Sequence, residues 1–186
     1  MKILENKGIC MVLMLVLIVC GFLLGGYKGL AGQYRKAADV FFVGETGDGI
    51  CIANDMGERA NALTNLQTVA KKYPAANDIE AACEGAAAAI NAYTQAAGDI
   101  SALFAANTQM ETAMTELYRV LDDASLSEKD EKYRQRLYTD FNSRNDTISH
   151  DPYYSYAADY NKLLAQFPAN VIAALTPAEI SPSACV

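Results

Sequence analysis

The chain begins with an apolar segment that contains no charged residue, and it continues with segments in which apolar and polar residues recur at helical spacing. The first segment, residues 8–26, reads GICMVLMLVLIVCGFLLGG. A helix of this length spans roughly 28 Å, about the thickness of the hydrocarbon core of a bilayer. We therefore expect a short tail at residues 1–7 and a transmembrane helix at residues 8–26.

A cleaved secretory signal is the first alternative, because Lys2 and Lys7 precede the apolar segment. No small-x-small cleavage site closes the segment, which continues through residues 22–24. A lipoprotein signal requires a small residue before its cysteine, whereas Val19 precedes Cys20. An uncleaved membrane anchor is the expected outcome.

The basic residues on the two sides of this anchor give little information on its orientation. Lys2 and Lys7 lie before it, and Lys28, Arg35 and Lys36 lie after it, so the positive-inside rule discriminates little. A short tail with two lysines normally stays in the cytoplasm. We therefore favour a domain on the extracytoplasmic side of a cell membrane.

Three glycines of this region, Gly21, Gly25 and Gly29, recur every four residues and share one helix face. This small-xxx-small pattern lets two membrane helices approach closely, so it is a candidate surface for a homo-oligomer. The alternative is that glycine is simply common in membrane helices.

Beyond residue 26 the apolar residues fall three and four positions apart, as in amphipathic helices. The first helix is expected to continue to about residue 43, where the three glycines of residues 44–49 end it. We interpret this loop as a connector, with a calcium site as the alternative. A second helix is expected to start at Asn54 or Asp55, either of which can cap it, and to end before Pro74.

The next apolar stripe covers residues 78–122. Residues 77–80 at its start resemble a capping box. Its apolar positions up to residue 104 alternate in steps of four and three, which predicts a seam facing a partner helix. One helix of this length would be about 67 Å long. A break near Gly98 is the alternative.

A further helix is expected after Ser127, because Ser127 and Asp130 together resemble a helix cap. Pro152 should kink this helix and Pro168 should end it. The apolar turn at residues 169–175 is expected to fold back against the bundle.

Long amphipathic helices joined by short connectors can bury their stripes only against one another. We therefore predict an all-α fold in which the transmembrane helix continues into an antiparallel up-and-down bundle, residues 27–176. Residues 177–186 read as a flexible tail.

Charge and cysteine content exclude some classes of function. The net charge of −7 argues against binding nucleic acid by bulk electrostatics. Outside the apolar segment the cysteines are Cys51, Cys83 and Cys185, an odd number with no CxxC pair, so neither a disulfide framework nor a zinc site is indicated. We expect no cofactor and no metal.

Four tyrosines, Tyr153, Tyr154, Tyr156 and Tyr160, cluster after Pro152. Because tyrosine is enriched at recognition surfaces, they are a candidate surface for a partner protein. The alternative is that Tyr156 and Tyr160 belong to the core while the other two shield the kink.

Two segments of the chain resemble the LemA family of bacterial membrane-anchored proteins. ERANALTNLQTVAKKY corresponds to a helix of that family, and YAADYNKLLAQFPANVIAAL corresponds to its more specific closing segment. The matching positions are Arg59, Leu63, Asn65, Leu66, Val69, Lys71, Tyr73, Asp159, Tyr160, Asn161, Phe167, Pro168, Asn170, Ile172 and Ala173. The resemblance implies an up-and-down bundle on one membrane helix, in a family without an established enzymatic role.

Catalytic constellations are hard to find in this sequence. His150 is the only histidine, and no serine or cysteine stands with it in a nucleophile motif. We therefore predict a non-enzymatic interaction or scaffold protein of the bacterial cell envelope, which holds an unidentified envelope protein or copies of itself at the membrane. A single-span sensor whose bundle binds a small ligand or peptide is the alternative, and an envelope hydrolase is a third reading.

Overall fold

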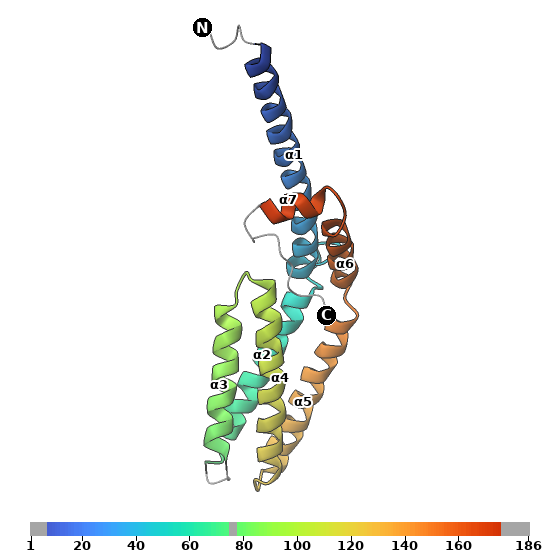
Figure 1. Ribbon diagram of the computed structural model, residues 1–186. Coiled ribbons are helices and arrows are strands. Elements are labelled where there is room, and N and C mark those ends of the chain that lie inside the picture. The colour runs from blue at the N-terminus through green and yellow to red at the C-terminus, as the bar shows by residue number, and fades with distance from the viewer. Residues whose placement is uncertain (1–6, 75–77, 176–186) are drawn as a thin grey trace. The chain divides into compact units, whose positions relative to one another are not determined.

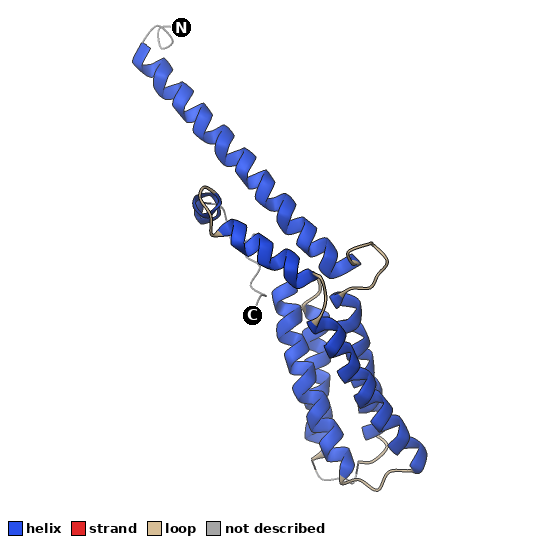
Figure 2. Ribbon diagram, turned by 90° about the vertical axis from the view of Figure 1, so that its right-hand side faces the viewer, coloured by secondary structure: helices blue, strands red, loops and turns tan. Residues whose placement is uncertain are grey.

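The computed structural model describes residues 7–74 and 78–175, and these residues form helices joined by loops, with no strand among them (Figure 1, Figure 2). The predicted all-α fold class is therefore confirmed. The helices are α1 (Lys7–Val43), α2 (Ile52–Ala70), α3 (Ile79–Gln95), α4 (Ile100–Asp122), α5 (Glu128–Ser149), α6 (Tyr153–Leu164) and α7 (Ala169–Leu175).

The described residues form two compact units. The first contains residues 7–37 together with residues 155–175, that is, most of α1 with α6 and α7. The second contains residues 38–154, with the end of α1, the glycine loop and helices α2 to α5. The expected bundle domain at residues 27–176 is thus divided between two units.

The second unit is a bundle of the four helices α2 to α5, in which consecutive helices run up and down (Figure 1). Helix α2 packs against α3, α4 and α5, and α3 pairs along its length with α4. This arrangement is the antiparallel bundle that the stripe pattern predicts.

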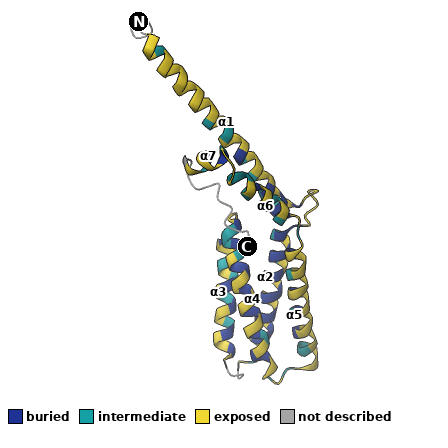
Figure 3. Ribbon diagram, turned by 45° about the vertical axis from the view of Figure 1, so that its right-hand side comes forward, coloured by how far each residue is buried: buried dark blue, intermediate teal, exposed yellow. Residues whose placement is uncertain are grey.

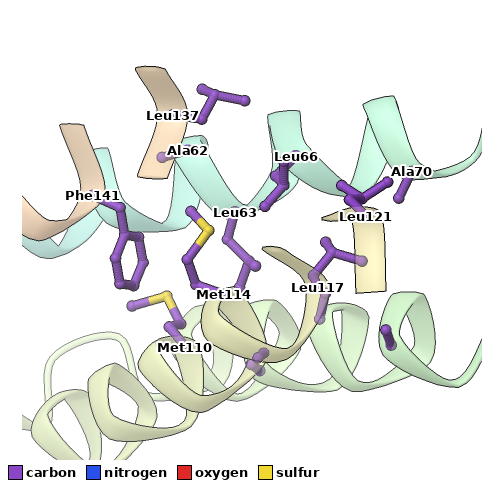
Figure 4. Packing of buried hydrophobic residues seen from close by; sticks show 14 of the residues in the cluster. Ala62, Leu63, Leu66, Ala70, Met110, Met114, Leu117, Leu121, Leu137 and Phe141 are labelled. Carbon is purple, nitrogen blue, oxygen red and sulfur yellow. The ribbon is translucent and has the colours of Figure 1, made fainter. Parts of the chain in front are cut away.

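The core of the bundle lies between α2, α4 and α5 (Figure 4). Leu63 and Leu66 of α2 meet Met114 and Leu117 of α4, and Phe141 closes the cluster from α5. These side chains recur three and four residues apart, so each helix buries one stripe and leaves the opposite face to solvent.

Helix α3 joins this core through small side chains. Its buried residues are Ile79, Ala82, Ala86 and Ala89, three of which are alanines. Ile79 and Ala86 belong to the seam predicted from the four-and-three spacing and are buried, whereas its other members Cys83, Ile90 and Tyr93 are only half-buried, and Ala82 and Ala89 are buried beside Cys83 and Ile90. Small buried side chains allow the backbones of neighbouring helices to approach closely.

The single helix considered for residues 78–122 is wrong, and the alternative break near Gly98 is confirmed. Helix α3 ends at Gln95 and α4 begins at Ile100, after Gly98 at a φ of +88°. Glycine adopts this left-handed conformation without the steric cost that a side chain adds. The Asp99 side chain then caps α4 by accepting a hydrogen bond of 3.0 Å from the Ala102 backbone N–H.

The other helix ends partly differ from expectation. Helix α2 begins at Ile52, earlier than predicted. Asp55 lies in its first turn, where it is buried and pairs with Arg144 instead of capping the helix. The Ser127 cap is confirmed, since its hydroxyl accepts from the Asp130 N–H at 3.2 Å. Asn77 of the proposed capping box lies outside the described residues, and Asp78 forms no side-chain cap.

Pro152 separates two helices where a kink was predicted. Helix α5 ends at Ser149 and α6 begins at Tyr153. The Asp151 carboxylate accepts a 2.8 Å hydrogen bond from the Tyr153 backbone N–H and so caps the N-terminus of α6. The chain thus breaks here because the residue before proline is disfavoured in a helix and an aspartate caps the next one.

The glycine loop at residues 44–49 ends α1 as predicted. Gly44 has a φ of +93°, and a Cβ there would lie 2.5 Å from the Ile50 carbonyl oxygen, so the turn requires glycine. Asp48 organises the loop by accepting hydrogen bonds from the Thr46 hydroxyl (2.6 Å) and the Ile50 N–H (3.0 Å). Both bonds lower the pKa of Asp48.

Candidate interaction surfaces

The N-terminal half of α1 exposes apolar side chains all around the helix (Figure 3). Leu17, for example, is 72% exposed. Within the described residues, α1 is the one helix long and apolar enough to cross a membrane, although a signal sequence near the N-terminus has the same character. Such a helix exposes far more apolar surface than a soluble monomer usually does.

The three glycines of the small-xxx-small pattern lie on an open part of α1. A Cβ added to Gly21, Gly25 or Gly29 would meet no atom within 4 Å. Their neighbour Gly26 is different, because a Cβ there would overlap Ile172 Cδ1 of α7. The face with Gly25 therefore remains available to a second helix, and self-association through it stays a prediction.

A polar groove runs between α2 and α5 on the surface of the bundle. It encloses about 630 Å³. Carboxylates, guanidinium groups and amides all line it, so it presents both signs of charge. The lining residues are Glu58, Asn61, Ala62, Asn65, Tyr133, Arg136, Leu137, Asp140, Ser143, Arg144 and Thr147.

One end of this groove is held by a cross-helix ion pair. Asp55 of α2 is buried and its Oδ1 lies 2.8 Å from Nη1 of Arg144, a half-exposed residue of α5. A buried carboxylate is costly without such a partner. The pair therefore fixes the register of α2 against α5 and places the Arg144 side chain at the groove.

A second arginine, Arg59, is completely buried beside the groove. Its guanidinium stacks on the Phe141 ring at 3.9 Å from the ring centroid and donates a hydrogen bond to Asn107 of α4. The exposed Glu111 carboxylate lies 3.7 Å from Nη2. Burial lowers the pKa of Arg59, and Glu111 opposes this shift. Arg59 thus ties α2 to α4 and α5 from inside the bundle.

Arg134 ties α5 to the end of α4 in a similar way. It donates hydrogen bonds to the Tyr118 carbonyl oxygen (2.8 Å), to Asp122 (2.7 Å) and to Glu131 (2.9 Å), and it stacks on the Tyr118 ring. Sequence reasoning missed this residue. The available signal was its place one turn before Leu137 and two turns before Phe141, on the same helical stripe.

The first unit carries a smaller groove between α1 and α6, of about 340 Å³. Lys36 Nζ lies 5.0 Å from the centroid of the Tyr156 ring, and the rings of Tyr34 and Tyr160 pack with centroids 5.9 Å apart. Burial, followed by the neighbouring Tyr34, raises the pKa of Tyr160 to about 12. Asp159 also lines this groove.

The four tyrosines do not form one surface. Tyr153 is 1% exposed and packs on Phe41 and Phe104 in the second unit, whereas Tyr160 is 2% exposed in the first unit. Tyr154 and Tyr156 are half-buried. Tyr153 and Tyr160 are therefore core residues, so the four do not form one partner surface. The alternative is confirmed for Tyr160, whereas Tyr156 is only half-buried and Tyr153 is buried where a shielding role was expected.

The residues of the LemA-like segments fall at several places. Asn65 lines the α2/α5 groove and Leu66 is buried in the core. Asp159 and Tyr160 line the α1/α6 groove, beside the half-buried Asn161. Phe167 and Asn170 are exposed and Pro168 is half-buried, at the corner between α6 and α7.

No protein family, curated protein or solved structure matches the chain. The resemblance to the LemA family therefore stays a prediction from the sequence.

Proposed function

We propose that this chain is a membrane-anchored, non-enzymatic interaction protein that uses its helical bundle to hold a partner protein at the membrane. The N-terminal half of α1 is the anchor in this proposal, and the α2/α5 groove is the partner surface.

The exposed apolar surface of α1 is the observation that carries the proposal. The bundle helices bury one stripe each, but the N-terminal half of α1 leaves its apolar side chains exposed on every face. Water is a poor solvent for such a helix, whereas the hydrocarbon core of a bilayer is a good one. The length of residues 8–26 matches that core.

The polar groove supports the interaction part of the proposal. It combines cations such as Arg136 with anions such as Asp140, and it is lined by the amides of Asn61 and Asn65. Complementary charges of both signs favour a specific register of a bound polypeptide. The resemblance of Asn65 and its neighbours to a LemA segment supports the same surface, in a family of bacterial envelope proteins.

A single-span sensor is the second candidate, because converging polar groups also suit a small ligand. It predicts that a small polar ligand raises the melting temperature of the purified chain. A protein partner predicts stable neighbours in the membrane instead.

Proximity labelling of the tagged full chain in its own membrane tests the proposal. We expect a stable set of labelled protein neighbours for the unchanged chain. Arg136→Glu reverses one charge in the groove and should remove part of that set. Lys129→Glu makes the same charge change at an exposed position of α5 outside the groove and is the matched control.

The outcomes separate the parts of the proposal. Neighbours lost with Arg136→Glu but kept with Lys129→Glu support the groove as the partner surface. The same neighbours with both variants would refute the groove. No stable neighbour, together with a ligand-induced rise in melting temperature, would favour the sensor.

A further inference from the structure

Helices α6 and α7 return along α1 toward its apolar half. Lys36 lies over Tyr156, Tyr34 packs on Tyr160, Leu30 clusters with Leu163 and Leu164, and Gly26 meets Ile172. Positions on α1 decrease as positions on α6 and α7 increase. Helix α6 therefore runs antiparallel to α1, and α7 lies at the end of α6 nearest the apolar half of α1 (Figure 1).

Helix α7 lies at the boundary of the apolar segment. Its Ile172 sits against Gly26, the last residue of that segment, and clusters with Leu30 one turn further on. Gly26 and Leu30 are about 6 Å apart along a helix axis. This distance is similar to the headgroup layer on one side of a bilayer, about 5 to 7 Å thick.

The orientation of α7 suits the same layer. Figure 1 shows α7 lying crosswise to α1, and Figure 2 looks nearly along α7 while α1 is seen from the side. A helix crosswise to a membrane span lies along the membrane surface. Interfacial helices adopt this arrangement, with apolar side chains reaching the boundary of the acyl chains.

Two large apolar side chains at this corner are exposed among the described residues. Phe167, in the loop before α7, is 82% exposed, and Val171 on α7 is also exposed. Ala169 and Ile172 face α1 instead and are buried against Leu30. The buried side of α7 therefore packs on α1, while Phe167 and Val171 remain exposed.

We propose that the α6–α7 corner docks on the bilayer, with Phe167 and Val171 inserted at the interface between headgroups and acyl chains. This inference rests on the proposed membrane anchor. The bound surface is the lipid around the span itself, because α7, which carries Val171 and begins just after Phe167, packs through Ile172 against Gly26, the last residue of the span. Docking would give the chain a second point of contact with the membrane, in addition to the span.

The chain contains no tryptophan, so a single introduced tryptophan reports on one position. We would reconstitute the full chain in phosphatidylcholine vesicles with and without brominated acyl chains, which quench tryptophan on contact. Phe167→Trp and Val171→Trp test the corner. Phe22→Trp tests the span, and Arg35→Trp is an exposed control on α1, about 14 Å beyond Gly26 along the helix.

We expect Phe22→Trp, Phe167→Trp and Val171→Trp to lose emission in brominated vesicles and Arg35→Trp to keep it. The Phe167→Trp emission should also shift to shorter wavelengths on reconstitution. Because Phe167 is exposed, this substitution should leave the circular dichroism spectrum and melting temperature unchanged, which checks that the variant is folded.

The failures are distinguishable. If Phe22→Trp is not quenched, the proposed anchor is wrong, and the docking proposal, which rests on it, is wrong as well. If Phe22→Trp is quenched while both corner variants behave like Arg35→Trp, the docking alone is wrong. A blue shift at Phe167→Trp without quenching by brominated lipid would mean that protein, such as a second copy of the chain, covers the corner, and this would also overturn the proposal.

Discussion

The apolar half of α1 and the buried stripe of α4 are built from similar residues but meet opposite surroundings. Leu17 of α1 is 72% exposed, whereas Leu117 of α4 is 0% exposed. Helix α4 alternates apolar and polar residues, so one face enters the core and the other faces water. The segment at residues 8–26 has no polar face to offer to water.

This difference shows that the medium, and not apolar content alone, decides what a leucine contributes. In the bundle, a leucine stabilises the fold by leaving water and filling space among its neighbours. On α1 the same side chain has few protein neighbours among the described residues, and in the proposed anchor it would contact lipid instead. Substitutions at equivalent residues should therefore have unequal effects.

The largest difference is expected between Leu117→Ala and Leu17→Ala. Leu117→Ala removes buried methyl groups and leaves a cavity, so it should lower the free energy of unfolding of the bundle by about 2 to 5 kcal/mol. Leu17→Ala should change it by less than about 0.5 kcal/mol, as at other sites without protein contacts. Chemical denaturation of both full-length variants in the same detergent measures the two values. Equal effects would contradict the assignment of Leu17 to a lipid-facing surface.

A second prediction concerns Arg59. The bundle core contains this charged residue, whereas the apolar segment contains none. Arg59 is buried, and its Nε and Nη2 atoms have no hydrogen-bond partner within the described residues. Asn107→Ala removes the amide that accepts from Nη1, so the guanidinium loses a hydrogen bond in the core. We expect a loss of about 2 kcal/mol in the free energy of unfolding.

Asn65→Ala is the matched control for Asn107→Ala, because Asn65 is an exposed amide on α2. It should cost less than about 0.5 kcal/mol. If Asn107→Ala lowers the free energy of unfolding as little as this control does, the hydrogen bond from Arg59 to Asn107 does not stabilise the folded chain.

The smallest predicted effect lies at the edge of the bundle, at Asp151. Burial, with a smaller contribution from the Asp55 and Glu45 carboxylates, raises the pKa of Asp151 above 3.8, against the opposing hydrogen bond from Tyr153. The folded chain therefore holds this proton more tightly than the unfolded chain. The contribution of Asp151 to the free energy of unfolding therefore falls as the pH rises from about 3.8 through the higher pKa of the folded chain.

Asp151→Asn keeps an oxygen that can accept from the Tyr153 N–H but removes the titration. The variant should melt slightly above the unchanged chain at neutral pH, and this difference should shrink as the pH falls below about 3.8. Melting temperatures across this pH range measure it. A variant that melts lower at neutral pH would mean that the charge of Asp151 stabilises the cap of α6.

Sequence patterns predicted the parts of the fold that depend on local periodicity. The apolar segment, the loop at residues 44–49 and the Ser127 cap each depend on neighbouring residues, and the structure places them as expected. The start of α2 was misplaced because Asp55 resembles a cap, although its partner Arg144 lies 89 positions away in the chain.

The candidate surfaces were harder to predict for the same reason. The α2/α5 groove combines residues from two helices that are far apart in the chain, and no local pattern shows which exposed faces lie side by side. The tyrosines illustrate the opposite error. Four rings close together in sequence suggested one surface, but Tyr153 and Tyr160 are buried in different units.

The most direct test of the membrane anchor is extraction of the full chain from its own membranes at alkaline pH, followed by flotation of those membranes on a density gradient. The account predicts that the intact chain floats with the lipid, and that it leaves the membrane fraction when residues 8–26 are deleted. A chain that retains its first thirty residues and yet is recovered free of lipid at the bottom of the gradient would contradict the account.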